Sequence, residues 1–189
     1  MYSNVKKMTF SAVLVALGIL IPIVMPVKVV IGPASFTLAS HVPVFLAMFI
    51  SPGVAISVAL GTAFGFFLSF PVIIAARALS HVCFAVIGAA ILQRKPSMTS
   101  STVKIIGFNI FIAIIHSLVE LLVVSIFFFT GNMSGAVYDQ GFLYVVCGLI
   151  GIGGIIHSLV DFSLAYYLAL KLNGQLALPI LIEGKRSGN

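Results

Sequence analysis

The chain has 189 residues, of which 61% are apolar and only 7% are charged. A water-soluble domain carries about 25% charged residues, so this composition excludes a soluble protein and indicates an all-α integral membrane protein. Ten basic residues against four acidic ones give a net charge of +6. In a membrane protein this excess reports orientation, and no nucleic-acid partner is expected.

Hydropathy predicts one membrane domain over residues 1–189, with six transmembrane helices and short loops. The approximate limits of the helices are 8–26, 36–50, 54–70, 72–92, 103–129 and 142–170. The second helix is the least obvious, because the apolar run His41–Ile50 is too short to cross and needs residues from the mixed segment before it. The polar segments 93–102 and 130–141 are predicted to be loops.

Charge placement favours a crossing by the second helix. With six crossings, both termini and the segment 93–104 lie on one side of the membrane, which then holds eight of the ten basic residues. These residues are Lys6, Lys7, Arg94, Lys95, Lys104, Lys171, Lys185 and Arg186. The positive-inside rule assigns that side to the cytoplasm, so both termini are expected to be cytoplasmic.

Ionisable residues at membrane depth form three pairs, and each pair has the i, i+4 spacing that places both members on one helix face. The pairs are Arg77 with His81, His116 with Glu120, and His157 with Asp161. Such residues are costly in a bilayer and need a partner or a wet cavity. The last two pairs also lie in nearly identical segments, 114–120 (IIHSLVE) and 155–161 (IIHSLVD).

The depth of these residues suggests an outward-facing polar pocket lined by Arg77, His81, His116 and Glu120. Two alternatives stay open, because Arg77 and Glu120 are expected either to contact a ligand or to form a structural ion pair between helices. His157 and Asp161 lie deeper, where hydrogen bonding between helices is the expected role.

Two further residues lie where the outer loops meet the helices, and both are candidates for the same pocket. They are His41, at the entrance of the second predicted helix, and Tyr144, just inside the last one. A tyrosine at that level is also an ordinary interface anchor.

Motifs for catalysis are absent from the sequence. There is no G-x-x-x-x-G-K-[ST] loop for ATP, no H-E-x-x-H zinc motif and no G-x-S-x-G elbow. The four acidic residues are too scattered for a magnesium-dependent transferase. No enzymatic activity, no metal and no cofactor of its own are therefore expected for this chain.

The sequence resembles the substrate-binding S components of energy-coupling factor (ECF) transporters of the group II type, the vitamin-uptake relatives of ABC importers. Nearly the whole chain carries the resemblance, with Ala12-xxx-Ala16 in the first helix and the segments 33–41 and 49–53 as its local marks. It implies a first outer loop that closes over the ligand, and ligand contacts from that loop and from the outer halves of helices four to six. On those helices this chain has Arg77, His81, Glu120 and Tyr144.

The resemblance also implies partners. Ala12 and Ala16 would pack on a transmembrane coupling (T) subunit, and two ATP-binding cassette subunits would use the ATP. The protein would lie in the bacterial plasma membrane as a multi-pass subunit surrounded by lipid.

For the substrate, a basic Arg77 beside His81 and opposite Glu120 suits a small vitamin or precursor. Niacin, a pyridoxine-like compound and hydroxymethylpyrimidine are the leading possibilities, and pantothenate is another carboxylate that Arg77 would suit. Two other functional classes remain open: a stand-alone proton-coupled carrier, and a non-transporting membrane scaffold of the bacterial cell-shape type.

Overall fold

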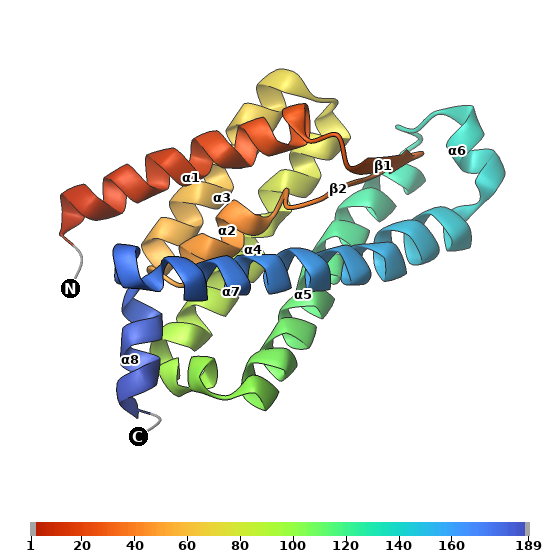
Figure 1. Cartoon of the computed structure of the whole chain (residues 1–189). Helices are drawn as coiled ribbons and strands as arrows, with labels where there is room; N and C mark the ends of the chain where they lie inside the picture. Colours follow the sequence, from red (N-terminus) through yellow and green to blue (C-terminus); the bar gives the residue numbers. More distant parts are fainter. Residues whose placement is uncertain (1–2, 188–189) are drawn as a thin grey trace.

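The computed structural model describes residues 3–187 and shows a helical membrane protein (Figure 1). Five long helical segments are apolar enough to cross a membrane. They are α1 (Asn4–Val24), α3 (Pro52–Ser69), α4 (Val72–Arg94), α5 (Thr102–Phe129), and a π-helix η2 (Leu143–Gly153) that continues into α7 (Gly154–Leu176). These segments correspond to five of the six predicted spans, and the last continues to Leu176 instead of ending at residue 170.

Serine caps begin two of these helices. The Ser3 hydroxyl accepts a hydrogen bond from the backbone N–H of Lys6 at the start of α1, and Ser51 accepts one from Val54 at the start of α3. Pro52 follows at the first position of α3, where its missing N–H costs nothing.

The mixed segment before residue 40 forms a β-hairpin, and the helix in the predicted second span is much shorter than 36–50. Strands β1 (Lys28–Ile31) and β2 (Ala34–Thr37) pair antiparallel around a turn in which Gly32 has φ 56°. Helix α2 covers only Val42–Met48, because residues 34–37 belong to the hairpin and Pro43 can stand only in the first turn of a helix.

Three short elements complete the chain. They are the 3-10 helix η1 (Pro96–Ser100), α6 (Gly135–Gln140) and α8 (Pro179–Ser187). The N-terminus, the C-terminus and α8 lie toward one end of the molecule, whereas the hairpin and α6 lie toward the other (Figure 1).

The segment that holds α2 leads from the hairpin toward the end where the termini lie. The backbone N–H of Ile180, in α8, donates to the carbonyl of Phe49, just after α2. The Tyr166 hydroxyl of α7 donates to the carbonyl of Thr99, which brings η1 to the same region. The chain therefore changes ends between the hairpin and α3, although its helix there has only seven residues.

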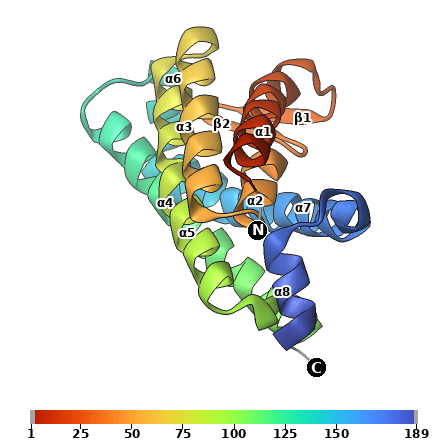
Figure 2. The same cartoon turned by 90° about the vertical axis from the view of Figure 1, so that its left-hand side faces the viewer.

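Helix α2 lies at the centre of the fold and packs against α1, α3, α4 and α7 (Figure 2). The rings of its Phe45 lie 5.2 Å from Phe84 of α4 and 5.3 Å from Phe162 of α7, all fully buried. Outside this core, large apolar side chains such as Phe64, Val103 and Phe129 are more than half exposed. A surface of this kind fits lipid rather than water.

Small residues bring α1 and α3 close together. A methyl group on Gly61 would lie 2.6 Å from Cγ2 of Val15, and one on Gly65 would collide with Ile19. The Gly61-xxx-Gly65 pattern of α3 is therefore used inside the protein. Ala12 and Ala16 of α1, by contrast, are exposed.

We expect Gly61→Ala to lower the free energy of unfolding by about 1–3 kcal/mol, because the added methyl group overpacks the contact with Val15. Gly107→Ala on α5 is the matched control, since a Cβ there meets nothing within 4 Å. The measurement is thermal unfolding in detergent, and equal stability of the two variants would contradict the close packing.

Candidate functional site

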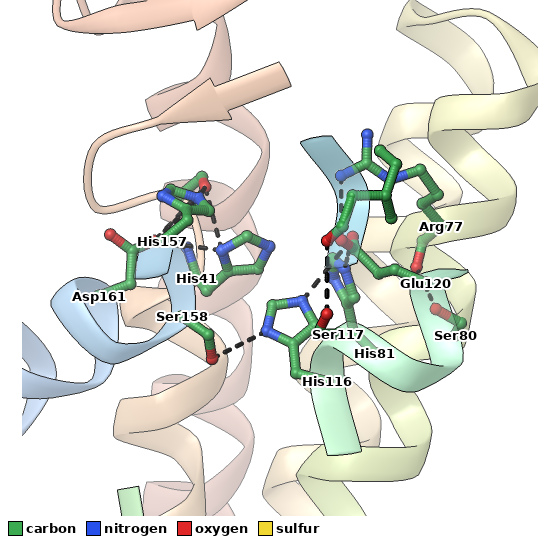
Figure 3. A network of polar contacts seen from close by, with 12 residues as sticks. His41, Arg77, Ser80, His81, His116, Ser117, Glu120, His157, Ser158 and Asp161 are labelled. Carbon is green, nitrogen blue, oxygen red and sulfur yellow. Dashed lines mark hydrogen bonds and ion pairs between the residues drawn. The ribbon is translucent and has the colours of Figure 1, made fainter. Parts of the chain in front are cut away.

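All four histidines of the chain meet in one cluster, although each comes from a different segment (Figure 3). The ring of His41, at the start of α2, lies 4.7 Å from His81 of α4, 4.6 Å from His116 of α5 and 4.9 Å from His157 of α7. His81 and His116 are 4.8 Å apart. His41 therefore links the two halves of the cluster.

A buried ion pair forms one half. Arg77 Nη2 donates to Glu120 Oε2 at 3.0 Å, and Arg77 Nη1 donates to the carbonyl of Pro33 at 2.8 Å. His81 Nε2 lies 3.0 Å from Glu120 Oε1. Because Arg77 and His81 are four residues apart on α4, both reach the same carboxylate of α5. These contacts tie α4, α5 and the turn of the hairpin together.

Asp161 forms the other half and holds the turn that follows the hairpin. Its Oδ1 accepts from the backbone N–H of Ala39 at 2.8 Å, and its Oδ2 accepts from the backbone N–H of His41 at 2.9 Å and contacts His41 Nδ1 at 3.1 Å. We expected His157 and Asp161 to form hydrogen bonds between helices. Asp161 instead accepts hydrogen bonds from the backbone of the turn before α2. His157, one helical turn away, contacts Ser40 of the same turn at 3.2 Å.

The carboxylate of Asp161 also supports a strained residue. Ala39 has φ 65°, a conformation that costs a non-glycine residue about 1–2 kcal/mol. A hydrogen bond from its N–H to a buried charged group is among the stronger ones and offsets this cost.

The two similar segments, 114–120 and 155–161, contact each other through His116 of the first and Ser158 of the second. His116 Nδ1 lies 3.0 Å from the Ser158 hydroxyl. Ser117 donates to the carbonyl of Gly151 at 2.6 Å, inside the π-helix. The repeated sequence therefore marks a contact between α5 and α7.

A cavity of about 220 Å³ adjoins this cluster, between the hairpin, the end of α1 and helices α2 to α5. Its lining comprises Pro22, Lys28, Val30, Ser35, Thr37, Ser40, His41, Val44, Thr62, Phe66, Phe70, Ile74, Arg77, Ala78, His81 and Glu120. The structure thus brings four of the six candidate residues, His41, Arg77, His81 and Glu120, to one cavity.

The other two candidates lie elsewhere. His116 belongs to the histidine cluster and is fully buried behind the cavity lining. Tyr144 lies on the π-helix with 53% of its surface exposed, and it is not among the lining residues.

Two residues of the cavity lining each have a buried polar atom with no hydrogen-bond partner within residues 3–187. These atoms are Nε of Arg77 and Oγ1 of Thr62. Unsatisfied buried groups are uncommon and mark a place where a bound molecule can supply the partner. Thr62 was not predicted from the sequence, although it places a hydroxyl group in the middle of the apolar helix α3.

A second hollow, of about 570 Å³, lies beside η1 and is lined by Lys95, Ser97, Lys104 and apolar residues. No buried ion pair of the described chain adjoins it. The cavity beside Arg77 is therefore the better candidate for a specific site.

Comparison with known proteins found a relative named niacin transporter NiaX, from Lactococcus lactis subsp. cremoris (strain MG1363). The two sequences are 44% identical over 188 residues, which cover 99% of this chain and 83% of the relative. No protein-family model matches the chain, and no solved structure matches it.

We expect Arg77→Leu and Glu120→Leu each to lower the free energy of unfolding by about 3–5 kcal/mol, because each strands a buried charge. The double variant should recover most of the loss. Lys104→Leu, at an exposed position, is the control and should change stability by no more than about 0.5 kcal/mol. Denaturation in detergent measures all four, and additive losses in the double variant would contradict the pairing.

Proposed function

The chain belongs to the substrate-binding S components of ECF vitamin transporters, and on this premise we propose that it binds niacin in the cavity beside Arg77. The relative's name supports niacin among the vitamins considered from the sequence. The observation that carries the proposal is the buried guanidinium of Arg77, whose Nε has no partner in the described chain and which lines a small cavity.

The cavity has the size and the chemistry for a single aromatic ring with a carboxylate. Its volume of about 220 Å³ is below the roughly 300–1,000 Å³ of sites for drug-sized ligands. Phe66 and Phe70 supply apolar surface for a ring. A carboxylate in this cavity would lie beside Arg77 and Thr62, the two lining residues that each keep a buried polar atom without a partner within residues 3–187.

The other vitamins fit less well. Pyridoxine and hydroxymethylpyrimidine carry no carboxylate for Arg77, and pantothenate has a carboxylate but no aromatic ring. Niacin has both the aromatic ring and the carboxylate, and little else.

We expect the purified protein to bind nicotinate at least about tenfold more tightly than nicotinamide, because the amide keeps the ring and the shape but loses the charge. Isothermal titration calorimetry with nicotinate, nicotinamide, pyridoxine and pantothenate measures this order. Equal affinity for nicotinate and nicotinamide, or tighter binding of pyridoxine, would contradict the proposed site.

Thr62→Val tests the cavity itself, since it removes one hydroxyl at nearly constant volume. We expect it to weaken nicotinate binding about 5- to 10-fold, the value of one hydrogen bond of about 1–1.5 kcal/mol. Thr130→Val, in an exposed loop, is the matched control and should bind as the wild type does.

The proposed topology has six crossings with both termini in the cytoplasm of a bacterial cell. Five crossings come from the long helices, and the segment with α2 supplies the sixth, because it leads from the hairpin to the hydrogen bond between Phe49 and Ile180. The clustering of eight basic residues on the side of the termini supports this orientation. The short α2 is shielded from lipid by its four helical neighbours.

The proposed partners are a T subunit and two ATP-binding cassette subunits, which use the ATP. This chain would bind the vitamin. It would catalyse no reaction and would need no cofactor of its own for transport. Ala12 and Ala16 are exposed on α1, so a partner helix can approach them closely. The Gly61–Gly65 surface is already covered by α1 and is a poorer candidate for the coupling face.

We expect replacement of both Ala12 and Ala16 by Trp to abolish assembly with the T subunit and vitamin uptake, and to leave nicotinate binding by the isolated protein unchanged. The control replaces Ile110 and Ile114, an exposed i, i+4 pair on α5, by Trp. Co-purification and uptake are the measurements. A complex that still assembles and transports in the alanine variant would place the coupling face elsewhere.

A further inference from the structure

We propose that His41, His81, His116 and Glu120 form a binding site for one divalent transition-metal ion, with Zn²⁺ as the probe ion. One ligand atom from each of these residues lies within 4.8 Å of the others. His81, His116 and Glu120 are buried, with at most 6% of each residue exposed, and His41 is 8% exposed. The proposal reverses our expectation from sequence that this chain binds no metal, and it does not depend on niacin as the substrate.

The strongest support for a metal site is a ring nitrogen of His116 that has no hydrogen-bond partner among the described residues. This atom, Nε2, is buried. It lies 3.7 Å from Glu120 Oε1, too far for a hydrogen bond, while Nδ1 of the same ring lies 3.0 Å from the Ser158 hydroxyl. A neutral ring that donates from Nδ1 keeps a lone pair on Nε2, and a cation between this lone pair and the carboxylate would satisfy both.

The partners of the rings are those that metal-binding histidines usually have. Such a histidine donates its second ring nitrogen to a carboxylate, a carbonyl or a similar group, which fixes the ring and raises its basicity. Nδ1 of His41 lies 3.1 Å from Asp161, and its other ring nitrogen points toward the side of Glu120 (Figure 3). Ser158 serves His116 in the same way.

The separations are close to those of a tetrahedral site. Metal–ligand distances of about 2.0–2.1 Å place neighbouring ligand atoms about 3.4 Å apart. Glu120 Oε1 lies 3.0 Å from His81 Nε2 and 3.7 Å from His116 Nε2. Because the four ligand atoms lie within 4.8 Å of one another, the widest pair has to close by at most about 1.4 Å, which small rotations of the rings can supply. Three imidazoles and one carboxylate suit zinc, nickel or cobalt better than calcium or magnesium.

The buried charges also favour a cation. Arg77 balances one of the two carboxylates, Glu120 and Asp161, so with neutral histidines the cluster carries one net negative charge. A divalent ion would turn this into one net positive charge. His41, His81 and Glu120 also line the cavity, so the surplus charge would attract a monoanionic ligand there.

A second triad, His41 with His157 and Asp161, is the competing location. Both oxygens of Asp161 already accept backbone N–H groups, from Ala39 and His41. Asp161 is therefore better placed to orient His41 than to bind the ion itself.

The test uses the full chain with a tag that contains no histidine, purified in detergent, treated with EDTA and dialysed. Zn²⁺ affinity is measured by competition with a colorimetric chelator, and Co²⁺ absorption reports the coordination geometry. We expect one Zn²⁺ per chain, an intense tetrahedral Co²⁺ spectrum, and a higher melting temperature with Zn²⁺.

Two variants and one matched control locate the ion. His116→Gln should weaken Zn²⁺ binding at least about 100-fold, because it removes a ligand outside the vitamin cavity. Ser158→Ala, which removes only the partner of His116, should weaken it about 10- to 100-fold. His157→Gln, in the competing triad, should retain wild-type affinity.

Three results would overturn the proposal: no Zn²⁺ binding by the wild-type chain, undiminished binding by His116→Gln, or loss of binding in His157→Gln alone. If His116→Gln does not fold, Ser158→Ala and the Co²⁺ spectrum of the wild type decide. An octahedral Co²⁺ spectrum together with unchanged affinity of Ser158→Ala would reject the site. Nicotinate binding is not used as a readout, so failure of this proposal leaves the proposed substrate untouched.

Discussion

Two buried carboxylates set the constraint on which the rest of this structure depends, because a charge inside a bilayer must be fully paired. Glu120 is paired by Arg77 and His81, and Asp161 by the turn between β2 and α2. Removing either set of partners would leave an anion in a medium that cannot solvate it. The helices therefore cannot slide or rotate freely, and the positions of α4, α5, α7 and the hairpin are specified relative to one another.

The same contacts explain how a seven-residue helix can form the centre of a membrane protein. Helix α2 is too short to be stabilised by a long apolar surface. Its start is held by the hydrogen bond from His41 to Asp161, and its end by the hydrogen bond from Ile180 to Phe49. Between these points, Phe45 packs against aromatic rings of α4 and α7. Hydrogen bonds at both ends and apolar packing in the middle thus stabilise α2, whereas the other helices rely on their long apolar surfaces.

Hydropathy was sufficient to predict the long helices, and the i, i+4 pairs were sufficient to predict which ionisable residues face inward. The ion pair of Arg77 with Glu120 was one of the two alternatives expected from the sequence, and the structure contains it. The contact of His41 with Asp161 was not predictable, since it depends on a turn whose shape is set by contacts far away in the chain. Tyr144 shows a second limit. Its position in the membrane was predicted from the sequence. It lies on a π-helix, however, where the 3.6-residue period that predicts the buried face of an α-helix does not apply. The hairpin was missed because the β-branched run Val29–Ile31 is only three residues long.

The left-handed conformation of Ala39 has a consequence for any movement of the hairpin. In this structure the hydrogen bonds of the turn to Asp161 hold Ala39 in a backbone state that it would otherwise leave. A movement of the hairpin away from Asp161 would break those bonds, but it would also return Ala39 to an ordinary conformation and recover about 1–2 kcal/mol. Such a movement would therefore cost less free energy than a count of hydrogen bonds suggests. An alanine at this position thus makes a movement of the turn easier than a glycine would.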